Sequence, residues 1–183
     1  MDCPDEPMPV KRFFPPQGDM LTTSSILKQR YHIQRKLGEG GMGQVYLAVD
    51  TVVQGLVAIK RIVGKDEQMV HRLEREYRIL QMISHPNVVK ALDFFQETGQ
   101  WFLVMEFVPG ISLKEYIQTN PDPPLHSKLA IANQICRAVE IINTAGILHR
   151  DLKPANVMVN KGTKQVKLVD MGLVKKLVPS KES

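Results

Sequence analysis

The stretch that decides the fold is HRDLKPANVMV, residues 149–159, which brings three kinds of polar chemistry together. Asp151 can accept a proton from a hydroxyl group, and Lys153 can neutralise negative charge on a group in transfer. Asn156 carries a carbonyl oxygen, a hard ligand of the kind that Mg²⁺ prefers. A charged surface loop needs none of these residue types at fixed spacing, so the stretch indicates a catalytic site.

A further acid follows a β-like run near the C-terminus, residues 166–169. Asp170 comes directly after this run and before Met171 and Gly172. Taken alone, an aspartate before a turn is most often a turn residue, because its side chain bonds to nearby backbone. Downstream of Asn156, a carboxylate that ends a strand is better interpreted as the second oxygen ligand of a Mg²⁺ ion that bridges phosphates.

The segment LGEGGMGQV, residues 37–45, has glycines at the spacing G-x-G-x-x-G-x-V. Glycine lets backbone N–H groups approach phosphate oxygens where a side chain would collide. A glycine-rich hairpin without a ligand and a dinucleotide-binding turn are the alternatives. The dinucleotide-binding turn requires a helix after the glycines. Here a strand-like segment follows, so a hairpin that lies over phosphates fits better.

The segment VAIK, residues 57–60, ends on a lysine among apolar neighbours. Adjacent strand residues point to opposite faces, and both Lys60 and Arg61 have apolar neighbours on their own face. Periodicity therefore leaves open which cation is buried, and a surface lysine is the simplest alternative. Glu76 lies on the apolar stripe of the following helix and is a candidate partner for Lys60. Breaking a buried pair of this kind costs ~3–5 kcal/mol.

The remaining pattern predicts a five-stranded antiparallel meander with one helix inserted after its third strand. The strands are expected at 31–38, 44–50, 56–62, 88–96 and 101–108, and the helix at about 66–84. After Pro109-Gly110 the pattern is helical, with a capping box at 112–115 that opens a short helix to about Gln118.

A longer helix is expected from about Ser127 to Asn143, and its polar residues cover only about a third of its circumference. Such a helix should be buried on most sides. The residues that follow it are too few to surround it. We expect it to need neighbours beyond the segments that this sequence provides.

The composition excludes several classes of protein. The chain has 183 residues, a formal net charge of +5 and two cysteines, Cys3 and Cys136. This predicts neither a disulfide framework nor a cysteine metal site. No apolar run reaches the ~18 residues of a membrane span, and no basic run interleaved with aromatics indicates nucleic acid. A cytoplasmic protein is expected, with no nucleic-acid partner and no membrane segment.

In their order and spacing, the glycine loop, VAIK, HRDLKPAN and DMG resemble the eukaryotic-type (Hanks-type) protein kinase family. HRDLKPAN alone contains six fixed identities. At roughly one in twenty each, chance agreement is on the order of 10⁻⁸ per position. Lysine two residues after Asp151 is similar to the serine/threonine branch, and GEGGMGQVYLA with HPNVV is most similar to bacterial members. The resemblance covers about residues 31–174.

The resemblance implies an α+β fold with ATP bound in a cleft between two lobes. It places a partial kinase domain at 27–178, after a flexible proline-containing leader (1–26) and before a tail (179–183). The five-stranded β-lobe would span 31–104, the hinge 105–110 and an incomplete helical lobe 111–178.

The resemblance also implies a role for each matching residue, with ATP and Mg²⁺ as cofactors and a Ser/Thr-containing protein as substrate. Lys60 would pair with Glu76 and hold the α- and β-phosphates. Asp151 would be the catalytic base, and Lys153 would contact the γ-phosphate. The metal ligands would be Asn156 and Asp170. The residues around ATP would be Leu37, Gly38, Glu39, Gly40, Gly41, Met42, Gly43, Gln44, Val45, Ala58, Lys60, the gatekeeper Met105, the hinge residues Glu106, Phe107 and Val108, and Met158.

Two departures from the family pattern affect the expected function. Met171 replaces the usual Phe of D-F-G, and a flexible apolar side chain there should change the balance of active and inactive arrangements. The activation segment, the A-P-E motif and the later helices have no counterpart before Ser183. We therefore expect a truncated serine/threonine kinase that binds nucleotide and phosphorylates little by itself. The alternative is a non-enzymatic, nucleotide-binding regulatory or docking module.

Overall fold

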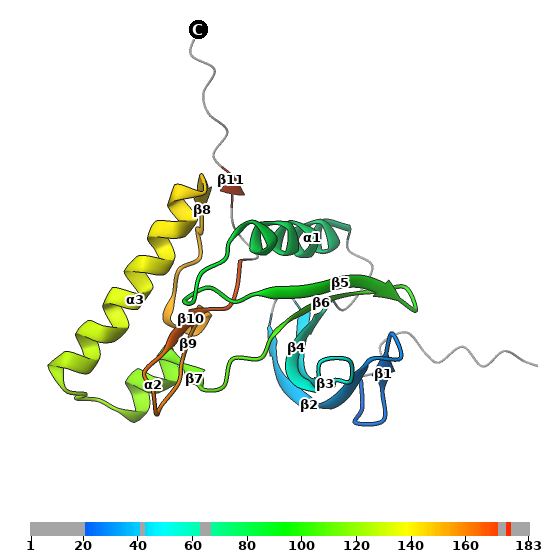
Figure 1. Ribbon diagram of the computed structural model, residues 1–183, viewed down its shortest axis with the longest axis horizontal. Coiled ribbons are helices and arrows are strands. Elements are labelled where there is room, and N and C mark those ends of the chain that lie inside the picture. Colours follow the sequence, from blue (N-terminus) through cyan, green and yellow to red (C-terminus); the bar gives the residue numbers. More distant parts are fainter. Residues whose placement is uncertain (1–20, 41–42, 63–66, 172–174, 177–183) are drawn as a thin grey trace, which may run out of the picture.

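The computed structural model describes residues 21–40, 43–62, 67–171 and 175–176. Figure 1 shows a curved sheet with a helix along one side, and a second group of helices and short strands beyond it. The bounds of the elements are β1 Ile26–Leu27, β2 Tyr31–Gly40, β3 Gly43–Asp50, β4 Gly55–Arg61, α1 Glu67–Met82, β5 Ala91–Glu97, β6 Gln100–Glu106, β7 Ile111–Ser112, α2 Leu113–Thr119, α3 Leu125–Thr144, β8 Ile147–Leu148, a 3₁₀ turn Pro154–Asn156, β9 Val157–Val159, β10 Val166–Leu168 and β11 Lys175–Lys176. Among the described residues, no helix is both long and apolar enough to cross a membrane.

The large sheet is antiparallel in the order β1-β2-β3-β4-β6-β5, which corrects the predicted five-stranded meander in two respects. A sixth strand, β1, pairs Ile26 with His32, so the sheet begins within the predicted leader. Two residues are too few to show a period-2 pattern. In addition, β6 rather than β5 lies beside β4. Because the connection through α1 is long, β5 need not pair with β4. The turn at Thr98-Gly99, with φ of 50° and 76°, reverses the chain so that β6 pairs with β5 on one side and β4 on the other.

The sheet curves until its two edges approach each other. Lys28, next to β1, forms an ion pair with Asp93 of β5 at 2.9 Å. The hydroxyl group of Tyr31 donates a hydrogen bond of 3.0 Å to the same carboxylate, and its ring stacks on Phe95. These side-chain contacts join β1 and β2 at one edge of the sheet to β5 at the opposite edge, although these strands are not neighbours in the sheet.

Buried residues lie on both faces of β4 near its end, and this answers the question that periodicity left open for this strand. Ile59 packs on one face in a core that includes Tyr31 and Phe102. Lys60 points to the opposite face, toward α1, and is 7% exposed. Arg61 returns to the first face and is 1% exposed. Both cations are therefore buried, on opposite faces of the strand.

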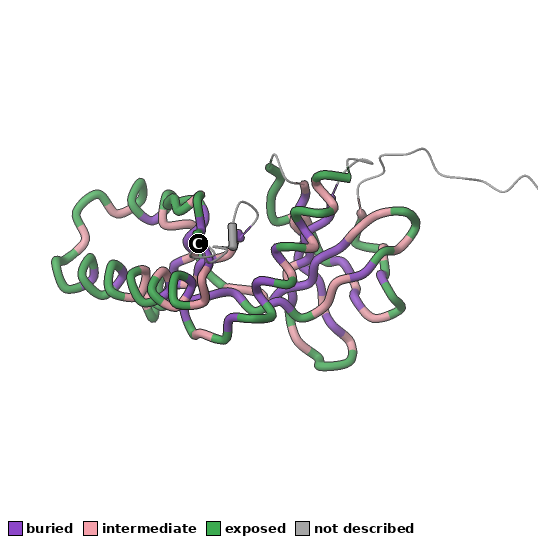
Figure 2. The backbone as a smooth tube through the Cα atoms, turned by 90° about the horizontal axis from the view of Figure 1, so that it is seen from above, coloured by how far each residue is buried: buried purple, intermediate pink, exposed green. Residues whose placement is uncertain are grey.

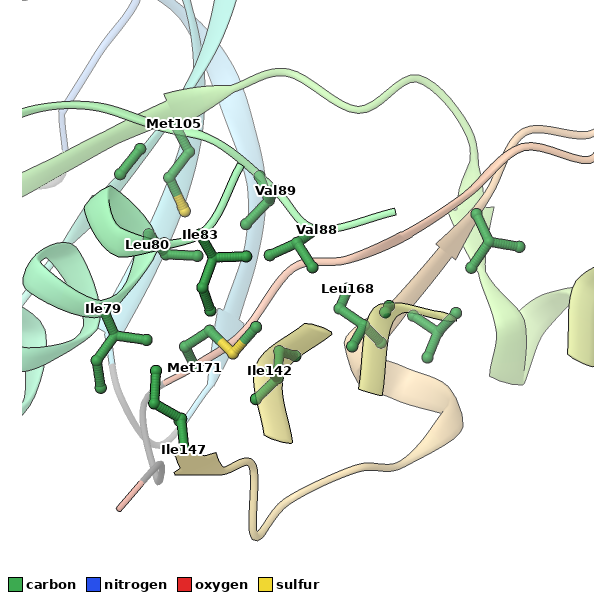
Figure 3. Packing of buried hydrophobic residues seen from close by; sticks show 14 of the residues in the cluster. Ile79, Leu80, Ile83, Val88, Val89, Met105, Ile142, Ile147, Leu168 and Met171 are labelled. Carbon is green, nitrogen blue, oxygen red and sulfur yellow. The ribbon is translucent and has the colours of Figure 1, made fainter. Parts of the chain in front are cut away.

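A second core continues from α1 through the 88–89 segment into the helical part of the chain (Figure 3). Leu80 of α1, Leu168 of β10 and Ile142 of α3 all belong to it. Met171 is fully buried among these side chains. The methionine in the position after Asp170 is therefore part of the hydrophobic core.

The predicted short helix is confirmed as α2, with the Ser112 hydroxyl accepting a hydrogen bond of 3.1 Å from the Glu115 N–H. The predicted longer helix is confirmed as α3, but it is buried on fewer sides than expected. Ile131 and Ile142 are buried, whereas Leu129 is 60% exposed. Figure 2 shows mostly exposed residues along this helix, at the left as in Figure 1.

The three loop glycines have different roles. Among the described residues, a Cβ atom on Gly38 or Gly40 would meet no atom within 4 Å. Gly43 has φ of +122°, and a Cβ atom there would lie 2.0 Å from the carbonyl oxygen of Arg61. The close approach of β3 to β4 therefore requires glycine at position 43, whereas positions 38 and 40 have space on the side where a Cβ would point.

We expect Gly43→Ala to lower the free energy of unfolding by about 2–4 kcal/mol, because it adds backbone strain and a steric clash. Gly40→Ala, the matched control, should change it by no more than about 1 kcal/mol. Urea unfolding followed by circular dichroism measures both. Equal effects of the two substitutions would contradict the assignment.

Candidate active site

The centre of the candidate site is a buried lysine that contacts two carboxylates. The Lys60 ammonium lies 2.7 Å from Glu76 Oε2 and 3.3 Å from Asp170 Oδ1. Glu76 is 1% exposed, and its other oxygen accepts a hydrogen bond of 3.2 Å from the Met171 N–H. The predicted Lys60–Glu76 pair is therefore present in the structure. It joins β4, α1 and the segment after β10.

The charges of this cluster are mutually dependent. Burial by itself lowers the pKa of Lys60, but the charges of Glu76 and Asp170 outweigh it, and the pKa lies above its ordinary value. Lys60 therefore stays protonated. Burial raises the pKa of Glu76, against the opposing effect of Lys60. A protonated lysine next to Asp170 suits a site that accepts an anion and its metal ion.

The HRDLKPAN segment forms a second polar group of residues. The Asp151 carboxylate accepts hydrogen bonds from the Lys153 ammonium at 2.7 Å and from the Asn156 amide at 3.0 Å. The same amide group donates to the Asp151 carbonyl at 2.9 Å. The hydrogen bond from Lys153 is the main cause of the lowered pKa of Asp151. Asp151 is therefore ionised at neutral pH, so it can accept a proton.

The oxygen atoms of Asn156 and Asp170 fit a magnesium site. Asn156 is 6% exposed, and its backbone carbonyl accepts a hydrogen bond of 3.1 Å from the N–H of Val169, the residue before Asp170. Because its amide nitrogen donates to Asp151, the side-chain oxygen faces away from that residue. No group of three His, Cys, Asp or Glu side chains with metal-binding geometry occurs in the described ranges. Mg²⁺ that is shared with substrate phosphates needs only one or two protein ligands.

Four apolar residues predicted to surround adenine lie outside both hydrophobic cores, and each is half-buried or exposed. They are Leu37, Val45, Ala58 and Met158. Val45 is paired with Lys60 across β3 and β4, so both side chains lie on the same face of the sheet. Met105 differs from this set, since it is 5% exposed and belongs to the core. Val108 is half-buried and packs against that core.

Several other predicted nucleotide contacts are limited to backbone atoms or lie outside the described residues. Gln44 is 7% exposed and accepts a hydrogen bond from the Tyr46 hydroxyl, on the face opposite Lys60. The side chain of Glu106 binds Lys167 at 2.6 Å. In the hairpin of the glycine loop, Glu39 pairs with Lys36. Gly41 and Met42 lie outside the described residues.

Two contacts near the site have no counterpart in the sequence analysis. Asn87 donates from its amide to Gln134 of α3 at 3.0 Å and to the Val166 carbonyl at 2.8 Å. Gln134 is one of the polar residues of this helix. The second contact is the ion pair between Glu106 and Lys167. The sequence separations are 47 and 61 residues, so no local pattern indicates either contact.

The stability of the folded site should depend on pH through His149. Burial lowers the pKa of His149 below its ordinary value, although nearby Asp170 and Asp151 oppose this. The unfolded chain therefore takes up a proton first as the pH falls through about 6.5. We expect the free energy of unfolding to decrease between about pH 7.5 and pH 5, measured by urea unfolding. His149→Phe should remove part of this slope, and an unchanged slope would contradict the assignment.

Comparison with known proteins agrees with this geometry. Residues 31–183 match the protein kinase domain family. The chain is 37% identical over 165 residues to serine/threonine-protein kinase pkn2 of Myxococcus xanthus, covering 87% of this chain and 20% of that protein. It is 38% identical over 163 residues to the probable serine/threonine-protein kinase PknB of Lactococcus lactis, covering 86% of this chain and 26% of that protein.

A third relative is serine/threonine-protein kinase PrkC of Bacillus subtilis, with 38% identity over 149 residues, 79% of this chain and 22% of that protein. The chain thus spans about a quarter or less of the length of these relatives. The family match confirms the resemblance and the α+β fold class inferred from the sequence, and it extends over most of the chain. This chain therefore belongs to the protein kinase family.

Proposed function

We propose that this chain provides the nucleotide- and metal-binding part of a serine/threonine protein kinase, which transfers the γ-phosphoryl group of ATP to a Ser or Thr hydroxyl of a protein. The observation that carries the proposal is the contact of Lys60 with both Glu76 and Asp170. It brings a phosphate-binding cation and a metal-binding carboxylate together at the base of the glycine hairpin. Names of the relatives support the serine/threonine class, and a cytoplasmic location would supply ATP.

Each polar residue has a distinct part in the proposed reaction. Bound Mg²⁺ would neutralise charge on the phosphates, and Asn156 and Asp170 would hold it. Lys60 would orient the phosphates through its position between Glu76 and Asp170. Asp151 would orient the substrate hydroxyl and accept its proton.

Lys153 connects the state of the base to the presence of an anion. Its ammonium group now bonds to Asp151 at 2.7 Å and is half-exposed. If Lys153 turns toward a phosphoryl group, Asp151 loses the main cause of its lowered pKa and becomes a stronger base. Base strength would thus increase when a phosphoryl group is in place.

A second candidate function is a nucleotide-binding regulatory module without catalysis, and the apolar surface of α3 favours it. Leu125 and Leu129 are 70% and 60% exposed, and exposed apolar surfaces often mark an interface. A defined oligomer in light scattering would support this module, whereas polydisperse aggregation would speak against it.

We expect Mg²⁺ to increase the ATP affinity of the 183-residue chain by about tenfold or more, because Asp170 would hold the metal ion and the ion would neutralise charge on the phosphates. Asp170→Asn should remove most of this increase and leave adenosine binding unchanged. Asp122→Asn is a matched control, since its carboxylate is 93% exposed. Isothermal titration calorimetry with and without Mg²⁺ makes the measurement. An undiminished Mg²⁺ effect in Asp170→Asn would refute the metal assignment.

For the 183-residue chain by itself, we expect nucleotide binding with little transfer to a protein substrate, because part of the helical lobe, including Leu125 and Leu129 of α3, is uncovered among the described residues. Incubation with radiolabelled ATP, Mg²⁺ and a Ser/Thr-rich protein tests this expectation. Efficient transfer that Asp151→Asn abolishes would show an active kinase and overturn the expectation. The Asp122→Asn chain again serves as the control.

A further inference from the structure

The ion pair between Glu106 and Lys167 closes a ring of contacts that joins the end of β6, residues 87–90 and β10. Lys167 Nζ lies 2.6 Å from Glu106 Oε1, and the Lys90 N–H donates to the same oxygen at 2.8 Å. The Glu106 N–H donates back to the Lys90 carbonyl at 3.0 Å. The end of β6 is thus bonded to the backbone of Lys90, just before β5, and to the side chain of Lys167 in β10.

The remaining part of the ring joins the segment before Lys90 to β10. The Val89 N–H donates to the Leu168 carbonyl at 2.8 Å, and the Leu168 N–H donates to the Asn87 carbonyl at 2.9 Å. Leu168 directly follows Lys167. The ring therefore runs from Glu106 through residues 87–90 to β10, and Lys167 closes it.

The ring joins the two ends of the proposed nucleotide site. The backbone after Glu106 is the segment expected to meet the adenine edge. Three residues after Lys167 comes Asp170, the proposed metal ligand. Lys167 is also paired with Met158, one of the residues proposed to lie around ATP, so their side chains share one face of the β9–β10 pair. This lysine is therefore the side-chain link between the two ends, beside the backbone bonds of residues 87–90.

The Glu106–Lys167 ion pair is partly shielded from solvent, so it can contribute to binding energy, but it lies outside the hydrophobic core. The side chains of Lys167 and Glu106 are 16% and 32% exposed. They line a pocket of about 340 Å³ that opens between the loop after α1 and the start of β5. Loss of a charged hydrogen bond in such a place has a measurable effect. It should not unfold the chain, because the backbone bonds of the ring persist.

We propose that Lys167 is a positioning residue for nucleotide binding, which holds the hinge and the metal-binding strand at the separation that Mg·ATP requires. This inference rests on the proposed nucleotide site. Ligands that touch both ends of the site depend on the ring, whereas adenosine, which has no phosphates, touches only the adenine end. The ratio of the two affinities therefore reports the positioning role and is insensitive to a general loss of folded protein.

The experiment measures the binding of Mg·ATP and of adenosine to the 183-residue chain by calorimetry. Lys167→Met should weaken Mg·ATP binding about five- to tenfold, as expected for loss of one charged hydrogen bond, and change adenosine binding less than about twofold. Lys167→Arg should restore the Mg·ATP affinity. Lys161→Met, in the exposed turn of the same hairpin, is the matched control and should change neither.

A second variant guards against misfolding of Lys167→Met. Glu106→Gln removes the charge of the pair but keeps an oxygen for the Lys90 N–H, and it should weaken Mg·ATP binding as Lys167→Met does. Equal weakening of both ligands, or no weakening, would overturn the positioning role and leave the proposed function in place. If the parent chain binds neither ligand, the proposed nucleotide site itself fails, and the inference fails with it.

Discussion

The rest of the structure depends on one constraint, the need of a buried ammonium group for a counter-charge. Lys60 is on a central strand between two buried faces, where an unpaired charge would cost several kcal/mol. Glu76 provides the counter-charge, and it can do so only when α1 lies against the sheet. The same carboxylate accepts the Met171 N–H, so the segment that carries Asp170 is placed by the same requirement.

The glycine hairpin shows how one motif combines structural and chemical demands. At position 43 glycine is required by the approach of β3 to the carbonyl group of Arg61, whether or not a ligand is present. At positions 38 and 40 no atom of the residues that the structure describes comes near the place of a Cβ. The open space there is consistent with the proposed approach of phosphates. The G-x-G-x-x-G spacing alone does not separate these two roles.

The two parts of the molecule are joined by polar contacts as well as by the core. The side chain of Asn87 bridges the loop after α1 to Gln134 of α3, and Glu106 with Lys167 joins β6 to β10. Both contacts lie outside the glycine hairpin. The site is therefore built from strands and a loop whose relative positions are set by directional bonds, and such bonds tolerate less variation than apolar packing.

The sequence by itself determined the family, the order of the elements and the partners of the main ion pair. Its motifs are local, and Glu76 stood out because a carboxylate on an apolar stripe needs a counter-charge. It did not determine the sixth strand, the position of β6 between β4 and β5, or the burial of Arg61. Only the tertiary structure decided these, together with the Glu106–Lys167 pair and the exposure of Leu129. Strand order and long-range pairs depend on which segments lie side by side in the folded chain. Hydrophobic periodicity reports only local structure, so it does not indicate contacts between residues far apart in the sequence.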